Sequence, residues 1–195
     1  MTAINKYLRP DLPVIELGGG IGLLSCVINK KLDKPENHIV LEADPELLPT
    51  IKNNRRLNHC RFTIESGALG YGSEPLWLNI TEFPGNSLNG VSSAAIQVRA
   101  TSLEDLINNS EIHTLTLVAD IEGAEANLIE QEITVLQKHV KALFFELHLD
   151  HIGKSRWNSL KTKLHDAGFR LMDQIGDIYY FEHVDQPVKL DVSSS

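Results

Sequence analysis

The sequence predicts an α/β fold in which helices cover both faces of a mostly parallel β-sheet. Short apolar runs typical of buried strands alternate with segments whose apolar residues recur at helical spacing. The helical segments are about ten residues long or more, as expected of helices that join neighbouring parallel strands. Ligands bind such sheets at the carboxyl ends of the strands, so we expect functional residues directly after the strands.

The first third of the chain shows this alternation clearly. Asp44 followed by Pro45 is typical of a helix start, with Asp44 as the cap and proline in the first turn. The elements expected here are a strand over 13–17, a helix over 22–32, a strand over 38–42, a helix from Asp44 towards Asn58, and a strand over 61–64.

The segment over 67–94 has a different composition, rich in Gly, Ser, Asn and Pro. This composition favours turns, so we expect a hairpin or meander with a mobile tip near 84–93. An extended piece over 96–100 follows. Thr101 or Ser102 is then suited to cap a short helix that ends near Ile107.

The second half returns to the alternation, and Gly168 is placed to end a helix. The expected elements are a strand over 114–119, a helix over 124–138, a strand over 142–147, a helix over 155–167, and strands over 169–172 and 178–181 around a turn at 176–177. We expect one domain over 1–185 and a flexible tail over 186–195.

Composition and charge narrow the classes of function. The chain has 195 residues, a net charge of −8 and a pI of about 5.4, whereas nucleic-acid-binding proteins usually carry a basic stripe. The densest basic stretch, Lys52 to Arg61, is typical of a solvated helix face, with a local site for an anionic substrate as the alternative. We expect no nucleic-acid partner.

Cys26 and Cys60 form no disulfide framework, and no signal peptide or membrane span is evident, so the cytoplasm is the expected compartment.

The first candidate site is the run from Glu16 to Gly22, which has the pattern Glu-x-Gly-x-Gly-x-Gly with glycines at 18, 20 and 22. Glycines allow a tight turn and let a ligand approach the backbone. Counted from Gly18 as the first position, the sixth position is Leu23, so the pattern departs from the dinucleotide fingerprint. It fits better a nucleoside with a charged amino-acid tail, with Glu16 placed to bind a ligand cation. The alternative is a purely structural turn.

Glu42 stands at the end of the second strand, 24 residues after Gly18. An acidic residue about 20 residues beyond a glycine loop is typical of a ligand for ribose hydroxyls. A carboxylate accepts two hydrogen bonds from a diol. Asp44 is the competing acid, but its place before Pro45 favours helix capping.

Two further clusters follow strands. Asp120, Glu122 and Glu125 lie within six residues, and capping of the next helix is the alternative to a catalytic role. Glu146, His148 and Asp150 would point the same way if the strand continued. Such a set could bind a metal, but we favour His148 as a proton acceptor or substrate ligand and expect no metal site.

With these motifs in view, the chain resembles the FkbM-type methyltransferases, which use S-adenosylmethionine (SAM). The resemblance covers roughly 13–150. It rests on the glycine loop, on Val40 to Pro45 leading into Asn53 to Asn58, on Gly67 to Gly70, and on the string Asp120 to Glu125, which is the most specific. The chain has Gly19-Gly20 where the family often has Ala-Asn, and Val118 where it often has lysine.

The resemblance implies a class I methyltransferase fold, a Rossmann-like seven-stranded sheet with an antiparallel last strand. It implies SAM at the glycine loop with Glu42 on the ribose and Ala68 near the adenine, and O-methylation as the commonest chemistry. Our hypothesis names Asp120, Glu122 or His148 as the general base. Asp120 also counts among the expected SAM ligands, with Glu16, Gly18, Gly20 and Gly22. The acceptor would be a small molecule or glycan, selected by residues 71–98 and the loop after His148.

Two other functions compete with this prediction. One is a non-catalytic SAM- or nucleotide-binding module of the same fold, because fold does not fix function. The other is an NAD-dependent oxidoreductase, against which the incomplete dinucleotide fingerprint argues.

Overall fold

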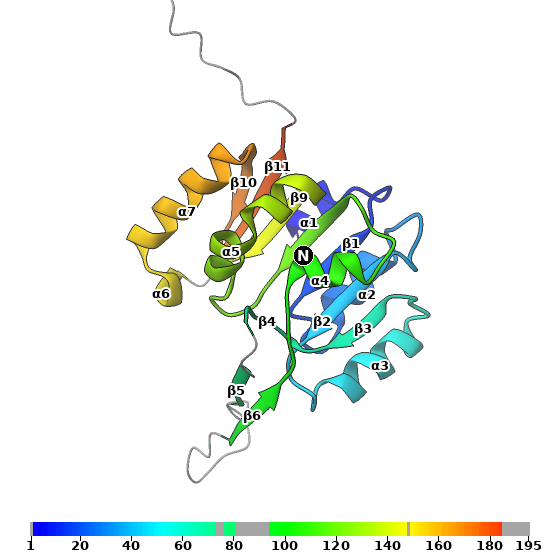
Figure 1. The fold of residues 1–195 in the computed structure, drawn as a ribbon. Coiled ribbons are helices and arrows are strands. Elements are labelled where there is room, and N and C mark those ends of the chain that lie inside the picture. Colours follow the sequence, from blue (N-terminus) through cyan, green and yellow to red (C-terminus); the bar gives the residue numbers. More distant parts are fainter. Residues whose placement is uncertain (1, 73–75, 81–93, 148, 185–195) are drawn as a thin grey trace, which may run out of the picture.

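A computed structural model describes residues 2–72, 76–80, 94–147 and 149–184. Its main element is a seven-stranded sheet of order β10-β11-β9-β8-β1-β2-β3 (Figure 1). β11 is antiparallel to both β9 and β10, whereas the other neighbouring pairs are parallel. The seven strands are β1 (Val14–Leu17), β2 (His38–Glu42), β3 (Thr63–Ser66), β8 (Leu115–Ala119), β9 (Val140–Glu146), β10 (Phe169–Ile175) and β11 (Ile178–His183). The expected fold class is confirmed, including the antiparallel last strand.

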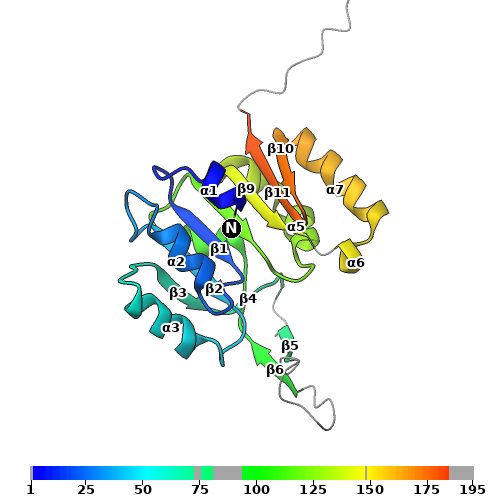
Figure 2. The ribbon, with the colours of Figure 1, turned by 180° about the vertical axis from the view of Figure 1, so that it is seen from behind.

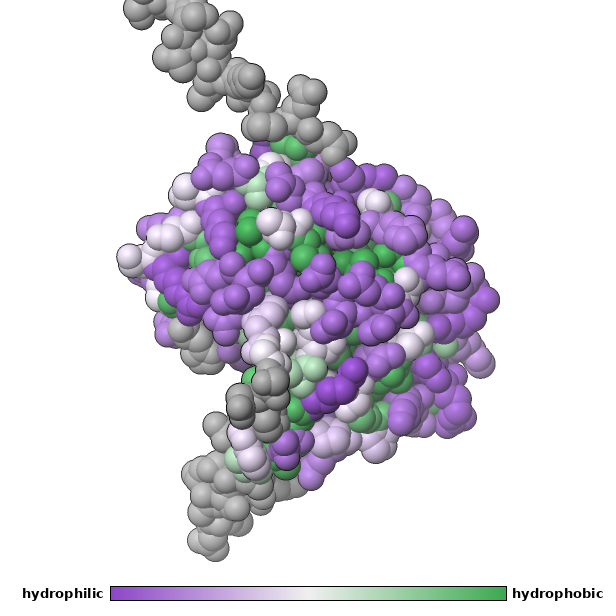
Figure 3. Space-filling view, viewed as in Figure 1, coloured by the Kyte–Doolittle hydropathy of each residue, from purple (hydrophilic) through white to green (hydrophobic). Residues whose placement is uncertain are grey.

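Helices cover both faces of this sheet (Figures 1 and 2). α1 (Thr2–Tyr7), α2 (Leu23–Asn29) and α3 (Leu48–Leu57) pack on one face, and α4 (Leu103–Asn108), α5 (Glu125–His139) and α7 (Lys154–Asp166) on the other. The outward surface of the second face is mainly hydrophilic (Figure 3). Apolar residues of the helices on both faces belong to the same buried clusters as strand residues, as the sequence periodicity predicts.

A separate hairpin projects from the body of the molecule, as expected from the turn-rich composition (Figure 2). It consists of β5 (Leu76–Ile80) and β6 (Ala94–Val98), which pair antiparallel. The expected mobile tip over 84–93 lies outside the described residues, and so does the expected tail over 186–195. At the base of the hairpin, β4 (Ala68–Leu69) pairs in parallel with β7 (Ala100–Thr101).

A buried glutamate fixes the chain at this base. Glu132 accepts hydrogen bonds from the N–H groups of Leu103 and Glu104 at 2.9 and 2.8 Å, which satisfies two free donors at the start of α4. The Tyr71 hydroxyl donates to the same carboxylate at 2.8 Å. Ser102 caps α4 from the other side in a capping box with Asp105, so Ser102 is the cap and Thr101 is not.

Some element boundaries differ from the expectation. α3 begins at Leu48, because the Asp44 carboxylate accepts the Glu46 N–H at 2.9 Å and so stabilises a turn before the helix. β9 ends at Glu146, and the short helix α6 (Leu149–Ile152) follows almost at once. The strand therefore does not continue to Asp150, so the condition under which Glu146 and Asp150 would point the same way is not met. No helix in the described part of the chain is long and apolar enough to span a membrane.

Candidate active site

The glycine loop after β1 joins three parts of the molecule. Gly18 has a φ of +89°, and a Cβ atom there would lie 1.9 Å from the carbonyl oxygen of Asp120. The N–H groups of Gly18 and Gly19 both donate to the carbonyl oxygen of Leu41, at 2.9 and 3.1 Å. The loop after β1 thus packs directly against the end of β2 and the loop after β8, and only glycine fits at position 18.

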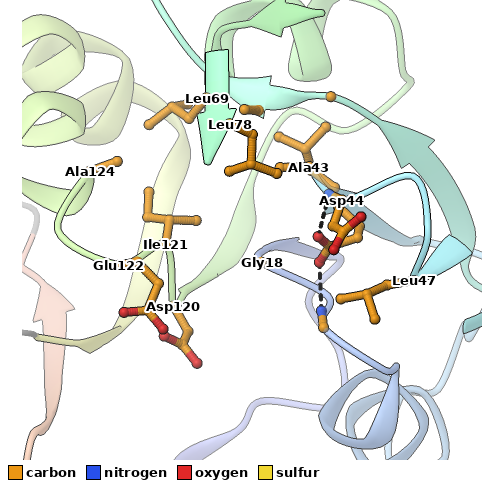
Figure 4. A pocket seen from close by; sticks show the side chains of 15 residues that line it. Gly18, Ala43, Asp44, Leu47, Leu69, Leu78, Asp120, Ile121, Glu122 and Ala124 are labelled. Carbon is orange, nitrogen blue, oxygen red and sulfur yellow. Dashed lines mark hydrogen bonds between the residues drawn. The ribbon is translucent and has the colours of Figure 1, made fainter. Parts of the chain in front are cut away.

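These loops enclose a cavity of about 490 Å³ at the carboxyl ends of the strands. Figure 4 shows Asp120, Ile121 and Glu122 on one side of it, Asp44 and Leu47 on the opposite side, and Leu69 and Leu78 on a third. The predicted site residues that line the cavity are Gly18, Gly20, Glu42, Ala68, Asp120 and Glu122. The structure therefore brings together residues that are up to 104 positions apart in the chain (Gly18 to Glu122).

Glu42 is held by the backbone on both sides of its carboxylate. One oxygen accepts the Gly20 N–H at 2.6 Å and the other accepts the Asp44 N–H at 2.7 Å, the two dashed lines in Figure 4. The residue is only 6% exposed. Burial raises the pKa of the Glu42 carboxyl, an effect that the backbone hydrogen bonds from Asp44 and Gly20 oppose. The carboxylate is thus fixed in orientation at the wall of the cavity.

The structure does not bring Glu16 to the cavity. Its side chain points to the face of the sheet that α2 covers, and it is 1% exposed. One carboxylate oxygen accepts the Ser25 hydroxyl at 3.0 Å, and the other lies 3.1 Å from Nε2 of His38. Strand geometry explains this position, because side chains of a strand point to the faces of the sheet and not beyond its end.

Gly22 also lies away from the cavity. It is the residue before α2, with a φ of +79°, and a Cβ atom there would lie 3.2 Å from the Ile51 side chain. Its role in the structure is to let α3 pack closely against the start of α2.

The loop after β8 has an unusual backbone that a buried carboxylate stabilises. Glu122 and Gly123 have φ angles of +54° and +98°, and for a glutamate this conformation is strained. Glu125 is 0% exposed and accepts the N–H groups of Ile121 and Gly123 at 2.7 and 2.9 Å. Because α5 begins at Glu125, Glu122 precedes the helix, and the two residues do not share a helix face. Glu122 is instead presented to the cavity.

Apolar side chains complete the cavity, and most of them were not predicted from the sequence. Leu47, Leu69 and Leu78 line it together with Ala68. Leu78 comes from the hairpin strand β5, where residues at alternate positions share a face. The alternation of positions in this strand could have indicated which residues share a face with Leu78. It does not indicate which of the two strand faces lines the cavity.

Two expectations concern residues after β9. His148 lies outside the described residues. Among residues 2–72, 76–80, 94–147 and 149–184, no group of three or more His, Cys, Asp and Glu side chains is arranged to hold a metal ion.

Similar solved structures share this fold at low sequence identity. The ribosomal protein L11 methylase of Lactobacillus delbrueckii subsp. bulgaricus has 17% identity and a TM-score of 0.53, with 93% of this chain and 73% of that chain covered. The fibrillarin pre-rRNA processing protein of Methanococcus jannaschii has 12% identity and a TM-score of 0.58, with 91% and 70% covered. Aeropyrum pernix fibrillarin, solved with natively bound SAM, has 10% identity and a TM-score of 0.51, with 89% and 67% covered.

The family assignment comes from a sequence profile. The profile described as the methyltransferase FkbM domain matches residues 24–171, which is most of the chain. A comparison with curated protein sequences finds no match. The matched range includes β2, the end of β8 and the acidic loop that follows, all of which contribute to the cavity. The chain therefore belongs to the FkbM family of methyltransferases, whose methyl donor is SAM.

Proposed function

We propose that the cavity binds SAM, with the ribose on Glu42, the adenine near Ala68 and the amino-acid tail near the glycine loop and Asp120. The cavity volume of about 490 Å³ is within the range of about 300–1,000 Å³ typical of small-molecule sites. At Gly20, a Cβ atom would meet nothing within 4 Å, so a ligand can approach the backbone there.

The observation that carries this proposal is the fixed carboxylate of Glu42. Each of its oxygens accepts one backbone N–H and keeps lone-pair capacity for a further donor, and a vicinal diol offers two donors. Because the backbone already orients the carboxylate, little side-chain entropy is lost when a ribose binds.

Bound SAM supplies a methyl group that is activated by its sulfonium centre. The chain then has to align the acceptor oxygen with this methyl group, a contribution worth about 7–11 kcal/mol when the geometry is good. Asp120 and Glu122, at the carboxyl end of β8, are the candidates in the described site for accepting the hydroxyl proton, which adds about 10²–10⁴-fold. His148 remains a third candidate.

We further propose O-methylation of a small molecule or glycan and not of a nucleic acid. The net charge of −8 and the carboxylates around the cavity oppose a polyanionic acceptor. We place the enzyme in the cytoplasm, which agrees with the free thiols of Cys26 and Cys60.

Methyl transfer from isotopically labelled SAM to a panel of hydroxyl compounds tests the reaction. We expect Glu122→Gln to lower turnover by about 10²–10⁴-fold while SAM affinity changes much less, and Asp120→Asn, which also borders the proposed amino-acid tail of SAM, to lower both turnover and SAM affinity. Asp177→Asn, at an exposed position on the β10–β11 turn, is the matched control. Full turnover in both site variants and in His148→Gln would refute the assignment of the base. A rise in the unfolding temperature of the protein with NAD and not with SAM would refute the proposal that SAM is the ligand.

A further inference from the structure

A second, smaller cavity adjoins the proposed SAM site at Asp120. Its volume is about 50 Å³, and Asp120 lines both cavities. The apolar part of its wall comes from α1, α2, β8, β9 and β11 and includes Ala3, Ile4, Leu24, Val118, Phe144 and Ile178. A methyl donor in the large cavity and a group in the small one would therefore meet beside the same carboxyl group.

α1 forms one wall of the small cavity and is firmly attached to the sheet. The Tyr7 ring stacks on Tyr180 with centroids 4.4 Å apart, and Tyr180 stacks in turn on Phe144 at 4.6 Å. The Tyr7 hydroxyl donates to the Asp173 carboxylate at 2.7 Å, and Lys6 forms an ion pair with the same group. Ala3 and Ile4 are buried in the core cluster that contains Val118 and Phe144. The small cavity is therefore a built part of the fold.

The polar groups of the small cavity are acidic. Asp120 and Glu146 follow the paired residues Ala119 and Phe145 at the ends of β8 and β9, so they occupy neighbouring register positions. No lysine, arginine or histidine contributes to the described wall. Like charges placed next to one another in a contact disfavour binding. This wall therefore selects against anions.

From these observations we infer that the methyl acceptor places a small apolar group in this cavity, beside the oxygen to be methylated, and carries no negative charge there. A water molecule needs about 10–15 Å³ of such space, so the cavity holds about three to five atoms of similar size. The acceptor class is a neutral or cationic alcohol with a short alkyl or similarly small apolar substituent. This inference rests on the proposed function, because the methyl donor defines which cavity faces the acceptor.

Three probes with the same number of carbon atoms and different charge test this specificity: n-butylammonium, butan-1-ol and butyrate. They are titrated into protein labelled at its isoleucine δ1 methyl groups, with and without saturating S-adenosylhomocysteine, and followed by NMR. We expect saturable shifts of the Ile4 and Ile178 methyl signals with the amine and the alcohol. Butyrate should bind at least about tenfold more weakly, a difference of about 1.4 kcal/mol.

Two variants assign the effect to this cavity. Glu146→Gln should reduce the preference for butylammonium over butyrate while butan-1-ol binding stays unchanged. Leu24→Trp should fill the cavity and abolish binding of all three probes while S-adenosylhomocysteine still binds. Equal binding of butyrate and butan-1-ol, or absence of shifts at Ile4 and Ile178 in the wild type, would overturn the inference. Failure of the wild type to bind S-adenosylhomocysteine would instead refute the proposed function.

Discussion

Replacing Glu42 by glutamine changes one atom of the proposed ribose ligand and keeps the shape of the side chain. In the wild type, both carboxylate oxygens face backbone donors, Gly20 N–H at 2.6 Å and Asp44 N–H at 2.7 Å. A glutamine has one oxygen and one NH₂ group, so its NH₂ group must face one of these donors or turn away. The variant therefore loses one hydrogen bond to a charged acceptor and one of the two acceptors for the ribose diol.

The expected loss of SAM affinity follows from the number of hydrogen bonds that the variant loses. A hydrogen bond to a charged group contributes about 1.5–3 kcal/mol, which corresponds to about 10- to 150-fold in affinity. We expect Glu42→Gln to weaken SAM binding by this factor in isothermal titration calorimetry. Glu46→Gln, an exposed position four residues away, should leave SAM affinity unchanged. Wild-type SAM affinity in Glu42→Gln would refute the proposed role of Glu42.

The raised pKa of Glu42 adds a pH signature to the same experiment. As pH falls through this pKa, the carboxyl gains an O–H donor that opposes the Gly20 and Asp44 donors, so SAM affinity should fall at a higher pH than for an exposed glutamate. Over the same range the native state binds more protons than the unfolded state at this group, so Glu42 adds to stability as pH falls. Protonation of Glu42 by itself therefore does not destabilise the fold. Glu42→Gln should lack this pH dependence, and Glu46→Gln should retain it.

Three further substitutions test the architecture around the cavity. Gly18→Ala should lower the free energy of unfolding, measured by urea denaturation, by more than about 3 kcal/mol, because its Cβ would lie 1.9 Å from a backbone oxygen. Gly176→Ala, at a φ of +62° in open space, should lower it by only about 1–2 kcal/mol. Equal losses of stability would contradict this explanation. Glu125→Gln should lower the free energy of unfolding by about 1–3 kcal/mol and speed hydrogen exchange of the Ile121 and Gly123 amides, which donate to this carboxylate. Unchanged exchange at both amides would argue against this role of Glu125. Glu16→Ala should destabilise by about 1–3 kcal/mol, because it removes the acceptor of the Ser25 hydroxyl and the partner of His38 Nε2 in the core. SAM affinity of the folded protein should stay close to wild type, and a large loss of affinity would place Glu16 in the site after all.

The strands and most helices were predictable because their signals are local. β2 has the predicted bounds, His38–Glu42, because an apolar run ends at a charged residue. α1 was missed, since six residues carry too little periodicity to indicate a helix, and its position depends on Tyr7 stacking against Tyr180. Such long-range contacts leave no local trace in the sequence.

The candidate site was predictable where residues follow strands, and not where a side chain has a buried partner. Gly18, Glu42 and Asp120 lie at strand ends, and the parallel sheet brings them to one cavity. Glu16 also precedes the glycine loop, but its carboxylate pairs with His38, 22 residues away on the neighbouring strand. We predicted that the Glu16 side chain reaches beyond the end of the strand, whereas the alternation of side chains along the strand points it to one face of the sheet.

The claim that this cavity holds the methyl donor can be tested by a SAM titration followed through backbone-amide NMR. We expect saturation at one SAM per chain, with the largest shifts at the amides of Gly18, Gly20, Asp44 and Ala68, which border the cavity. Absence of binding, or binding that shifts amides elsewhere and leaves these four unchanged, would contradict the account.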